Sequence, residues 1–178
     1  GADPDHMAGL DNFCWCDPVK TPDNPDGDYK LAQLVRANQA LFDICVQYGI
    51  PLVSGKDSMK NDYRIGDMKI SIPPTLLFSA VAKIRDVRKA VTMDLKREGD
   101  ILYMLGTTYR DIGASEYAAY RGLDESSVPT VRHPEISIQL YRCLHTAIQQ
   151  GLVRAAHDLS DGGLGVALTE MCFAGEFG

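Results

Sequence analysis

Long apolar runs and an excess of basic residues are both missing from this chain of 178 residues. No stretch approaches the roughly 20 apolar residues that a helix needs to cross a bilayer, and the first residues lack the basic-then-apolar order of a secretion signal. The net charge of −6 argues against a general binder of nucleic acid or of membrane surfaces. These absences predict a cytoplasmic protein with no nucleic-acid or membrane partner.

Cysteine pairs of the CxxC kind are absent as well. The chain has 5 cysteines, and Cys14 and Cys16 form CWC with no second pair or nearby histidine to complete a zinc site. Cys45, Cys143 and Cys172 stand where helical patterns need a small apolar residue. We therefore expect reduced core thiols rather than a structural zinc.

The first half of the chain predicts a helix followed by a strand. A hydrophobic content of 45% is enough for a real core in one domain or two small ones. Residues 17–28 are rich in Pro, Asp and Gly and predict a loop. An amphipathic helix that ends at Gly49 is then predicted by Leu31, Leu34, Val35, Leu41, Phe42, Cys45 and Tyr48. Residues 50–53 predict a buried strand that leads into a loop at 54–61.

Strands and helices continue to alternate in the second half. Residues 75–82 are apolar on both faces, which is typical of a central strand. A helical turn at 86–91, a charged connection at 95–100 and a strand at 101–105 are expected next. A helix from Pro134 to about Gln150, ending at Gly151, is predicted by Ile136, Leu140, Cys143, Leu144 and Ile148 on one face. The alternation predicts an α/β protein, in which a mixed α+β topology is left open.

The segment AHDLSDGGLG at 156–165 combines a histidine, two carboxylates, a hydroxyl and three glycines. Apolar residues at helical spacing follow at once, so the glycines are expected at or just before a helix N-terminus. Unpaired backbone N–H groups and the helix dipole favour phosphate there. The alternative is a tight turn with an ordinary N-cap at Ser160 or Asp161, and the turn alone does not decide between the two.

A second polar cluster, SGKDSMKN at 54–61, follows the expected strand at the usual exit point for ligand-binding loops. It is not a Walker A loop, because it lacks the upstream glycine and the Ser or Thr directly after the lysine. From spacing alone, a solvated loop is an equally good interpretation.

Three segments together resemble one family. LDNFCWCDP at 10–18, VSGKDSMKN at 53–61 and AHDLSDGGLGVALTEMCFAG at 156–175 are similar to the second half of the phosphoribosylformylglycinamidine synthase family of purine biosynthesis. The resemblance implies two aminoimidazole-ribonucleotide-synthetase-like modules, both incomplete. Residues 8–86 would be the tail of the N-terminal module, 87–98 a connection, and 99–178 the start of the C-terminal module. Residues 1–7 are expected to be a cloning remnant.

The reaction that the resemblance implies is an ATP-dependent carbon–nitrogen ligation. Formylglycinamide ribonucleotide is phosphorylated on its amide oxygen, and ammonia from glutamine displaces the phosphate to give the amidine, ADP and phosphate. The implied cofactors are ATP or ADP and Mg²⁺, which neutralises the phosphates. The implied partners are the remaining modules of the synthetase and a glutaminase domain or subunit.

The resemblance also implies roles for individual residues. Asp158 matches a Mg²⁺ ligand, and Ser58 matches a position that touches the substrate. Asp11, Gly55 and Ser160 match positions that contact the nucleotide. Lys56 departs from the asparagine of shorter family members, and since an ammonium cannot ligate Mg²⁺, it is expected to pair with phosphate. Other candidates for phosphate contact are Gly162 and Gly163.

No catalytic residue is assigned. His157 could act as a general base or could orient the carboxylate beside it, and general-base catalysis is the weaker hypothesis. The family's histidine-bearing catalytic motif and its metal-binding glutamate would lie before residue 10, so the chain is expected to be an inactive fragment. Two alternatives stay open: a non-catalytic scaffold that holds a nucleotide, and another ATP-dependent member of the superfamily, such as aminoimidazole ribonucleotide synthetase or selenophosphate synthetase.

Overall fold

The computed structural model describes residues 1–124, 126–175 and 177 and divides into two compact units. The N-terminal unit is Ala2–Arg85, and the C-terminal unit is Asp86–Gly178 together with Gly1. Strands and helices are mixed along the chain, which confirms the predicted α/β class. Among the described residues, no helix is long and apolar enough to cross a membrane.

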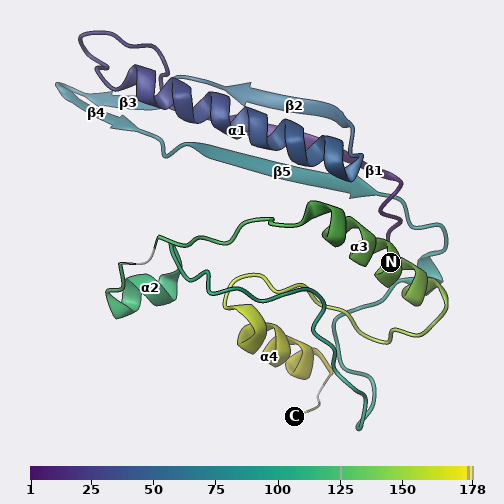
Figure 1. Ribbon diagram of the computed structural model, residues 1–178. Helices are drawn as coiled ribbons and strands as arrows, with labels where there is room; N and C mark the ends of the chain where they lie inside the picture. The colour runs from purple at the N-terminus through teal and green to yellow at the C-terminus, as the bar shows by residue number, and fades with distance from the viewer. Residues whose placement is uncertain (125, 176, 178) are drawn as a thin grey trace. The chain divides into compact units, whose positions relative to one another are not determined.

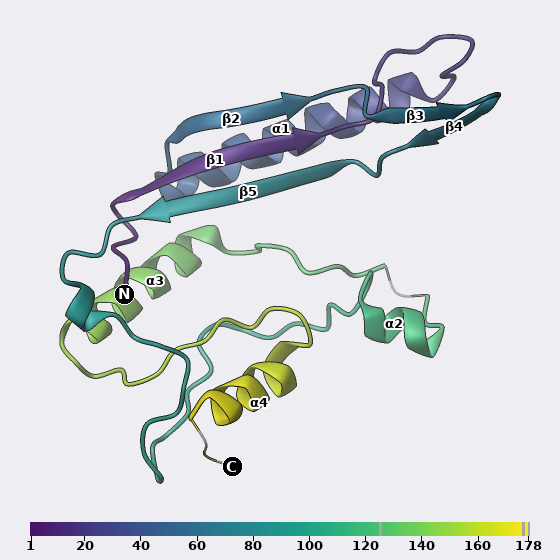
Figure 2. The same ribbon diagram turned by 180° about the vertical axis from the view of Figure 1, so that it is seen from behind.

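The N-terminal unit is a three-stranded sheet covered on one face by a long helix. Its strands are β1 (Met7–Cys14), β2 (Leu52–Ser58) and β5 (Thr75–Ala82), in the order β2-β1-β5. Strand β1 pairs parallel to β2 and antiparallel to β5. The parallel pair requires a crossover, which α1 (Gly27–Tyr48) supplies while lying along the sheet (Figure 1). Figure 2 shows β1 between its two neighbours, with α1 behind them.

Helix α1 confirms the prediction from periodicity and ends as expected. Gly49 adopts the left-handed conformation with φ of 67°, and its N–H is directed to the carbonyls of Cys45 and Val46. A residue without Cβ takes this conformation at little cost, which explains why the helix stops there.

The core of this unit lies between α1 and β1. It consists of Phe13, Trp15, Cys16, Leu41 and Cys45, none of them more than 8% exposed. The rings of Phe13 and Trp15 have centroids 6.0 Å apart. The indole N–H of Trp15 donates to the carbonyl of Lys30 at 3.0 Å, so the buried ring leaves no donor unpaired.

The loop prediction for 54–61 is wrong in its first part. Strand β2 begins at Leu52 and continues to Ser58, since residues 54–58 pair in register with residues 10–14 of β1. Backbone pairing with β1 therefore outweighs the polar composition of this segment. Nor is the strand buried, because it is an edge strand with Leu52 43% and Val53 64% exposed.

The strand predicted at 75–82 is confirmed as β5, but its central place is wrong. It lies at the sheet edge, and most of its side chains are exposed. The centre belongs to β1, which was not predicted because its pairing partners lie far away in sequence. Residues 1–7 also contact this region: Asp3 is 7% exposed, its N–H donates to the carbonyl of Lys83, and Met7 begins β1.

A second, two-stranded sheet consists of β3 (Asp62–Ile65) and β4 (Met68–Ser71). Asp62 connects this hairpin to the loop before α1, because one of its carboxylate oxygens accepts from the backbone N–H of Asp17 at 3.0 Å and lies 3.5 Å from Lys69 Nζ. Asn24, buried in that loop, accepts from Lys69 at 2.7 Å and from Lys30 at 2.9 Å. These polar contacts fix the hairpin to the start of α1.

Removing the Asp62 charge is expected to destabilise the N-terminal unit in a pH-dependent way. Burial alone would raise the pKa of this carboxyl, but hydrogen bonds from Ser71 and Asp17 and the charge of Lys69 hold the pKa below its ordinary value. A lowered pKa contributes stability above about pH 4, which is lost as the pH falls through the folded-state pKa. Asp62→Asn should therefore lower the free energy of unfolding by about 2 kcal/mol at pH 7.

Urea unfolding followed by the fluorescence of Trp15, the single tryptophan, measures this effect. The difference from the wild type should shrink between pH 7 and pH 3. Asp67→Asn removes an exposed carboxylate from the turn of the same hairpin and should leave stability unchanged. Equal losses in the two variants would contradict a specific role for Asp62.

The C-terminal unit contains the short helix η1 (Val87–Lys89) and the helices α2 (Glu116–Arg121), α3 (Pro134–Gln149) and α4 (Gly163–Gly175). The predicted turn at 86–91, the helix from Pro134 and the helix after the glycines are confirmed. Helix α2 was not predicted, although Ser115 caps its N-terminus through a hydrogen bond from the N–H of Ala118 and Gly122 ends it in the left-handed conformation.

One prediction for this unit is wrong, and a second is right only in part. Residues 101–105 form no strand, because within the described part of the chain no segment pairs with them, and a strand needs such a partner. In α3 the predicted apolar face is buried only in part: Ile148 is buried as expected, whereas Ile136 and Cys143 are exposed. Ile138, which was not assigned to that face, is buried as well. All 5 cysteines are free thiols, but only Cys16 and Cys45 are buried.

Candidate functional site

The segment 156–165 forms the turn into α4, as its glycines predict. Gly162 and Gly163 have φ of 80° and 61°, a region that L-residues with side chains rarely adopt. The N–H of Gly163 donates to the carbonyl of Ser160 at 3.0 Å and closes the turn. Both glycines, named from sequence as phosphate-contact candidates, thus lie at the N-terminus of α4, where free N–H groups favour an anion.

A continuous chain of side-chain contacts surrounds Asp158. Its Oδ1 lies 3.2 Å from Nδ1 of His157, and its Oδ2 accepts a hydrogen bond from Ser160 Oγ. The other ring nitrogen of His157, Nε2, lies 2.6 Å from Oε2 of Glu170 on α4. The structure therefore brings Asp158 and Ser160 together and adds Glu170, which sequence reasoning missed.

The charges in this chain reinforce each other. Hydrogen bonding to Glu170 raises the pKa of His157 above its ordinary value; partial burial opposes this, and Asp158 adds to it. The hydrogen bond from Ser160 is the largest cause of a lowered pKa at Asp158, and His157 contributes further. The arrangement favours an imidazolium between two carboxylates.

Two of the residues predicted to contact the nucleotide are neighbours in the N-terminal unit. Asp11 on β1 pairs with Gly55 on β2, and the Asp11 carboxylate covers Gly55 so closely that a Cβ there would lie 2.4 Å from Oδ1. Asp11 shares with Phe13 the sheet face that α1 covers, since alternate residues of a strand point to the same side. Glycine at position 55 is thus explained by the approach of this carboxylate.

Lys56 and Ser58 are not brought together with Asp11. They pair with Asn12 and Cys14, and the alternation of side chains along a strand places them on the opposite sheet face. Lys56 is exposed, and Ser58 donates through Oγ to Asn61 Oδ1 at 2.9 Å. The four predicted residues of β1 and β2 therefore divide between two faces.

The residues around Asp158 fit only one kind of magnesium site. Among the described residues there is no group of three or more His, Cys, Asp or Glu side chains able to hold a metal. Mg²⁺, however, commonly keeps several waters and is held by one or two carboxylates together with substrate phosphates. The Asp158 side chain is 79% exposed beside an anion-favouring helix end, which fits Mg²⁺ carried by a nucleotide and not an all-protein cage.

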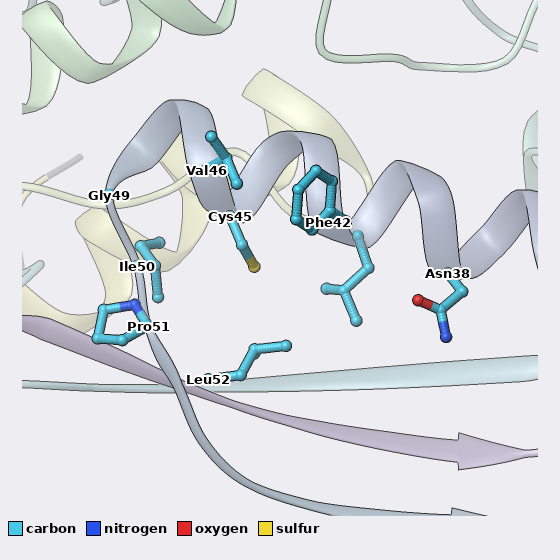
Figure 3. Close-up of a pocket in the computed structure, with 9 residues that line it drawn as sticks. Asn38, Phe42, Cys45, Val46, Gly49, Ile50, Pro51 and Leu52 are labelled. Carbon is cyan, nitrogen blue, oxygen red and sulfur yellow. The ribbon is translucent and has the colours of Figure 1, made fainter.

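The apolar pocket of the N-terminal unit lies elsewhere (Figure 3). It has a volume of about 440 Å³ between the second half of α1 and the start of β2. Phe42, Cys45, Ile50 and Leu52 are among its lining residues, and burial raises the pKa of the Cys45 thiol. None of the predicted site residues lines it, and most of its lining residues are apolar, with Asn38 as a polar exception.

Comparison with known proteins gives matches for both units. Residues 97–178 match the family described as AIR synthase related protein, C-terminal domain. The whole chain is 34% identical to phosphoribosylformylglycinamidine synthase subunit PurL of Thermomicrobium roseum and 31% identical to that of Gloeobacter violaceus, covering 22% of each relative. For the same subunit of Alkaliphilus metalliredigens, 89% of the chain is 35% identical and covers 20% of the relative.

The chain thus spans about a fifth of the length of these curated relatives. The similarity runs through all three motifs that carried the predicted resemblance, and it is confirmed over the full length of the chain. This protein is therefore similar from end to end to one part of the phosphoribosylformylglycinamidine synthase subunits, and its residues 97–178 match the family described as AIR synthase related protein, C-terminal domain.

Proposed function

We propose that this chain contributes a magnesium–nucleotide site to a phosphoribosylformylglycinamidine synthase. The observation that carries the proposal is the similarity of the entire chain to PurL subunits, together with a glycine turn that presents an exposed carboxylate at a helix N-terminus. The reaction would be the ATP-dependent conversion of formylglycinamide ribonucleotide to the amidine, with ammonia from glutamine. The two units would be parts of two synthetase-like modules, residues 8–86 and 99–178, which act in the cytoplasm with the remaining modules and a glutaminase.

In the C-terminal unit, Asp158 would ligate Mg²⁺ and Ser160 would contact the nucleotide. Gly162 and Gly163 would both contact phosphate, at a helix end where the dipole adds to the attraction. The N–H of Gly162 would donate to a phosphate oxygen, whereas Gly163, whose N–H already donates to Ser160, would leave room for phosphate beside the backbone. Bound Mg²⁺ supplies charge neutralisation for the phosphates. The backbone and Asp158 would then form no covalent bond to the substrate, because catalysis of phosphoryl transfer depends on positioning the reactants and on electrostatic stabilisation.

In the N-terminal unit, Asp11 and Gly55 are proposed to contact nucleotide. Their contact with each other supports a common role in nucleotide binding, since Gly55 lets the Asp11 carboxylate lie against β2. Ser58 would touch the substrate and Lys56 would pair with phosphate, both from the other face of the sheet.

Asp158→Asn should weaken the Mg²⁺-dependent binding of ADP by about 10- to 100-fold, because one charged interaction is lost. Isothermal titration of the chain with ADP, with and without Mg²⁺, measures this, and circular dichroism checks the fold. Asparagine keeps one acceptor oxygen for His157, and its Nδ2–H can donate to Ser160 Oγ in place of the second oxygen, so the turn should persist. Asp161→Asn removes an exposed carboxylate from the same turn and serves as the matched control.

The proposal fails if the wild type binds ADP equally with and without Mg²⁺, or if the two variants bind alike. Catalysis and a nucleotide-holding scaffold role both require this binding. A turnover assay of the complete synthetase carrying the same substitution separates them, since only a catalytic site would lower the rate in proportion to occupancy.

A further inference from the structure

Glu170 lies on α4, 13 residues after His157, and contacts this residue of the turn directly. Its Oε2 is 2.6 Å from Nε2 of His157, which is the closest contact that the imidazole makes to a carboxylate. Glu170 is 50% exposed, whereas the His157 side chain is only 16% exposed. The ring is thus held between α4 and the turn.

The second ring nitrogen of His157 transmits this contact to Asp158. An imidazole ring is rigid, so fixing Nε2 against Glu170 also fixes the direction in which Nδ1 points, toward Asp158 Oδ1 at 3.2 Å. Ser160 holds the other oxygen of the same carboxylate. An aspartate that is 79% exposed would otherwise rotate freely, and here both of its oxygens are restrained.

We infer that Glu170 is a positioning residue that acts through His157 to orient the Asp158 carboxylate toward metal-bound nucleotide. The inference rests on the proposed function, since it assumes that Asp158 meets Mg²⁺. Carboxylates that ligate a metal are themselves commonly held by hydrogen bonds from outer-shell groups, and loss of such partners typically costs about 10- to 100-fold in metal affinity. A ligand held in place before binding avoids the ordering cost that a mobile one incurs.

A purely structural role is the competing explanation, because the same contact also ties α4 to the turn. The two roles differ in what a variant loses. If the contact is only structural, a variant that removes it should weaken all ADP binding at the turn and the stability of α4. If the contact positions Asp158, the variant should weaken only the part of ADP binding that depends on Mg²⁺.

The test is titration of ADP with and without Mg²⁺ into four versions of the full chain: wild type, Glu170→Ala, His157→Gln and the double variant. Positioning through His157 predicts that each single variant lowers the Mg²⁺-linked affinity about tenfold and that the double variant loses no more than either. Affinity for ADP alone should stay within twofold, and circular dichroism should show an intact helix content.

Two further variants sharpen the result. Glu170→Gln keeps an oxygen acceptor for Nε2 and should retain most of the Mg²⁺-linked affinity. Glu135→Gln removes a charge beside another histidine of the same unit, His133, at 3.5 Å, and should bind as the wild type does.

Proton NMR provides a readout without metal: the sheltered Nε2–H signal of His157 should be present in the wild type and lost in Glu170→Ala.

Additive losses in the double variant, or equal losses of affinity with and without Mg²⁺, would overturn the inference in favour of a structural role. The inference would also be overturned if Glu170→Ala lost the Nε2–H signal of His157 but kept the Mg²⁺-linked affinity of the wild type. Absence of Mg²⁺-dependent binding in the wild type itself would overturn the proposed function and this inference with it, so the two failures are distinguishable.

Discussion

Phe13→Ala is expected to remove a large share of the stability of the N-terminal unit. The Phe13 ring is 2% exposed and packs against Trp15, Leu41 and Cys45 in the core between β1 and α1. Replacing a buried Phe by Ala costs about 3–5 kcal/mol through lost burial and the cavity left behind. Small domains unfold with only about 5–15 kcal/mol in total, so a loss of this size is a large share of the stability.

Urea unfolding followed by Trp15 fluorescence measures the loss directly, because this tryptophan packs against Phe13. Phe42→Ala is the matched control, since it makes the same chemical change on α1 where the ring is 59% exposed, and it should cost about 1 kcal/mol or less. Similar losses in the two variants would show that the core does not lie where the burial places it.

The helices of this fold could be predicted from sequence because their signals are local. Periodic apolar residues and a following glycine predicted α1 with its end at Gly49, and the same reasoning predicted α3 and α4. The hairpin β3–β4 and α2 also carried local signals that were passed over. Gly66 and Asp67 stand between two short alternating runs, and Ser115 and Gly122 bracket α2.

The sheet could not be predicted in the same way, because its order depends on pairing between distant segments. Strand β1 has no clear alternation of its own, and β2 continues through a polar segment only because β1 pairs with it. Residues 101–105 show the reverse case, since an apolar run without a pairing partner in the described part of the chain forms no strand. Composition therefore predicts the tendency of a segment to form a strand, and the presence of a pairing strand decides whether it does.

The candidate site was predicted in its residues but not in its connections. The motif at 156–165 indicated Asp158, Ser160 and the glycines, whose polar types and turn chemistry are visible in sequence. Glu170 could not be assigned to the site from the sequence. Its side chain reaches His157 only because α4 folds back against the turn. Likewise, the division of Lys56 and Asp11 between two sheet faces follows from the register of β1 and β2.

Gly162→Ala is expected to disrupt the turn into α4. With φ of 80°, a residue with a side chain is strained by about 1–2 kcal/mol. A Cβ there would also lie 2.2 Å from Cγ2 and 2.8 Å from Cβ of Val166, and the second contact cannot be relieved by rotating the valine side chain. Crowding of this kind adds about 1–3 kcal/mol, so the total loss should be about 2–5 kcal/mol.

Gly163→Ala separates the two causes, because φ is 61° and no atom lies within 4 Å of the added Cβ. This variant should lose about 1 kcal/mol of stability, which comes from backbone strain alone. Hydrogen exchange of the α4 amides, measured by mass spectrometry, should show fast exchange in Gly162→Ala and near-normal exchange in Gly163→Ala. Val166→Ala in the Gly162→Ala background removes Cγ2 but leaves Cβ, and should restore protection in part.

Binding of ADP with Mg²⁺ to the same two variants tells what the glycines are for. If they serve only to form the turn, affinity should fall in proportion to the loss of α4 protection, and Gly163→Ala should bind nearly as the wild type does. If phosphate approaches the backbone at these positions, Gly163→Ala should reduce the affinity although its exchange is near normal, and Gly162→Ala should reduce it by more than the loss of α4 protection explains. The second outcome is the one that the proposed magnesium–nucleotide site requires, because only a ligand close to the backbone detects a methyl group that no other atom of the unit contacts.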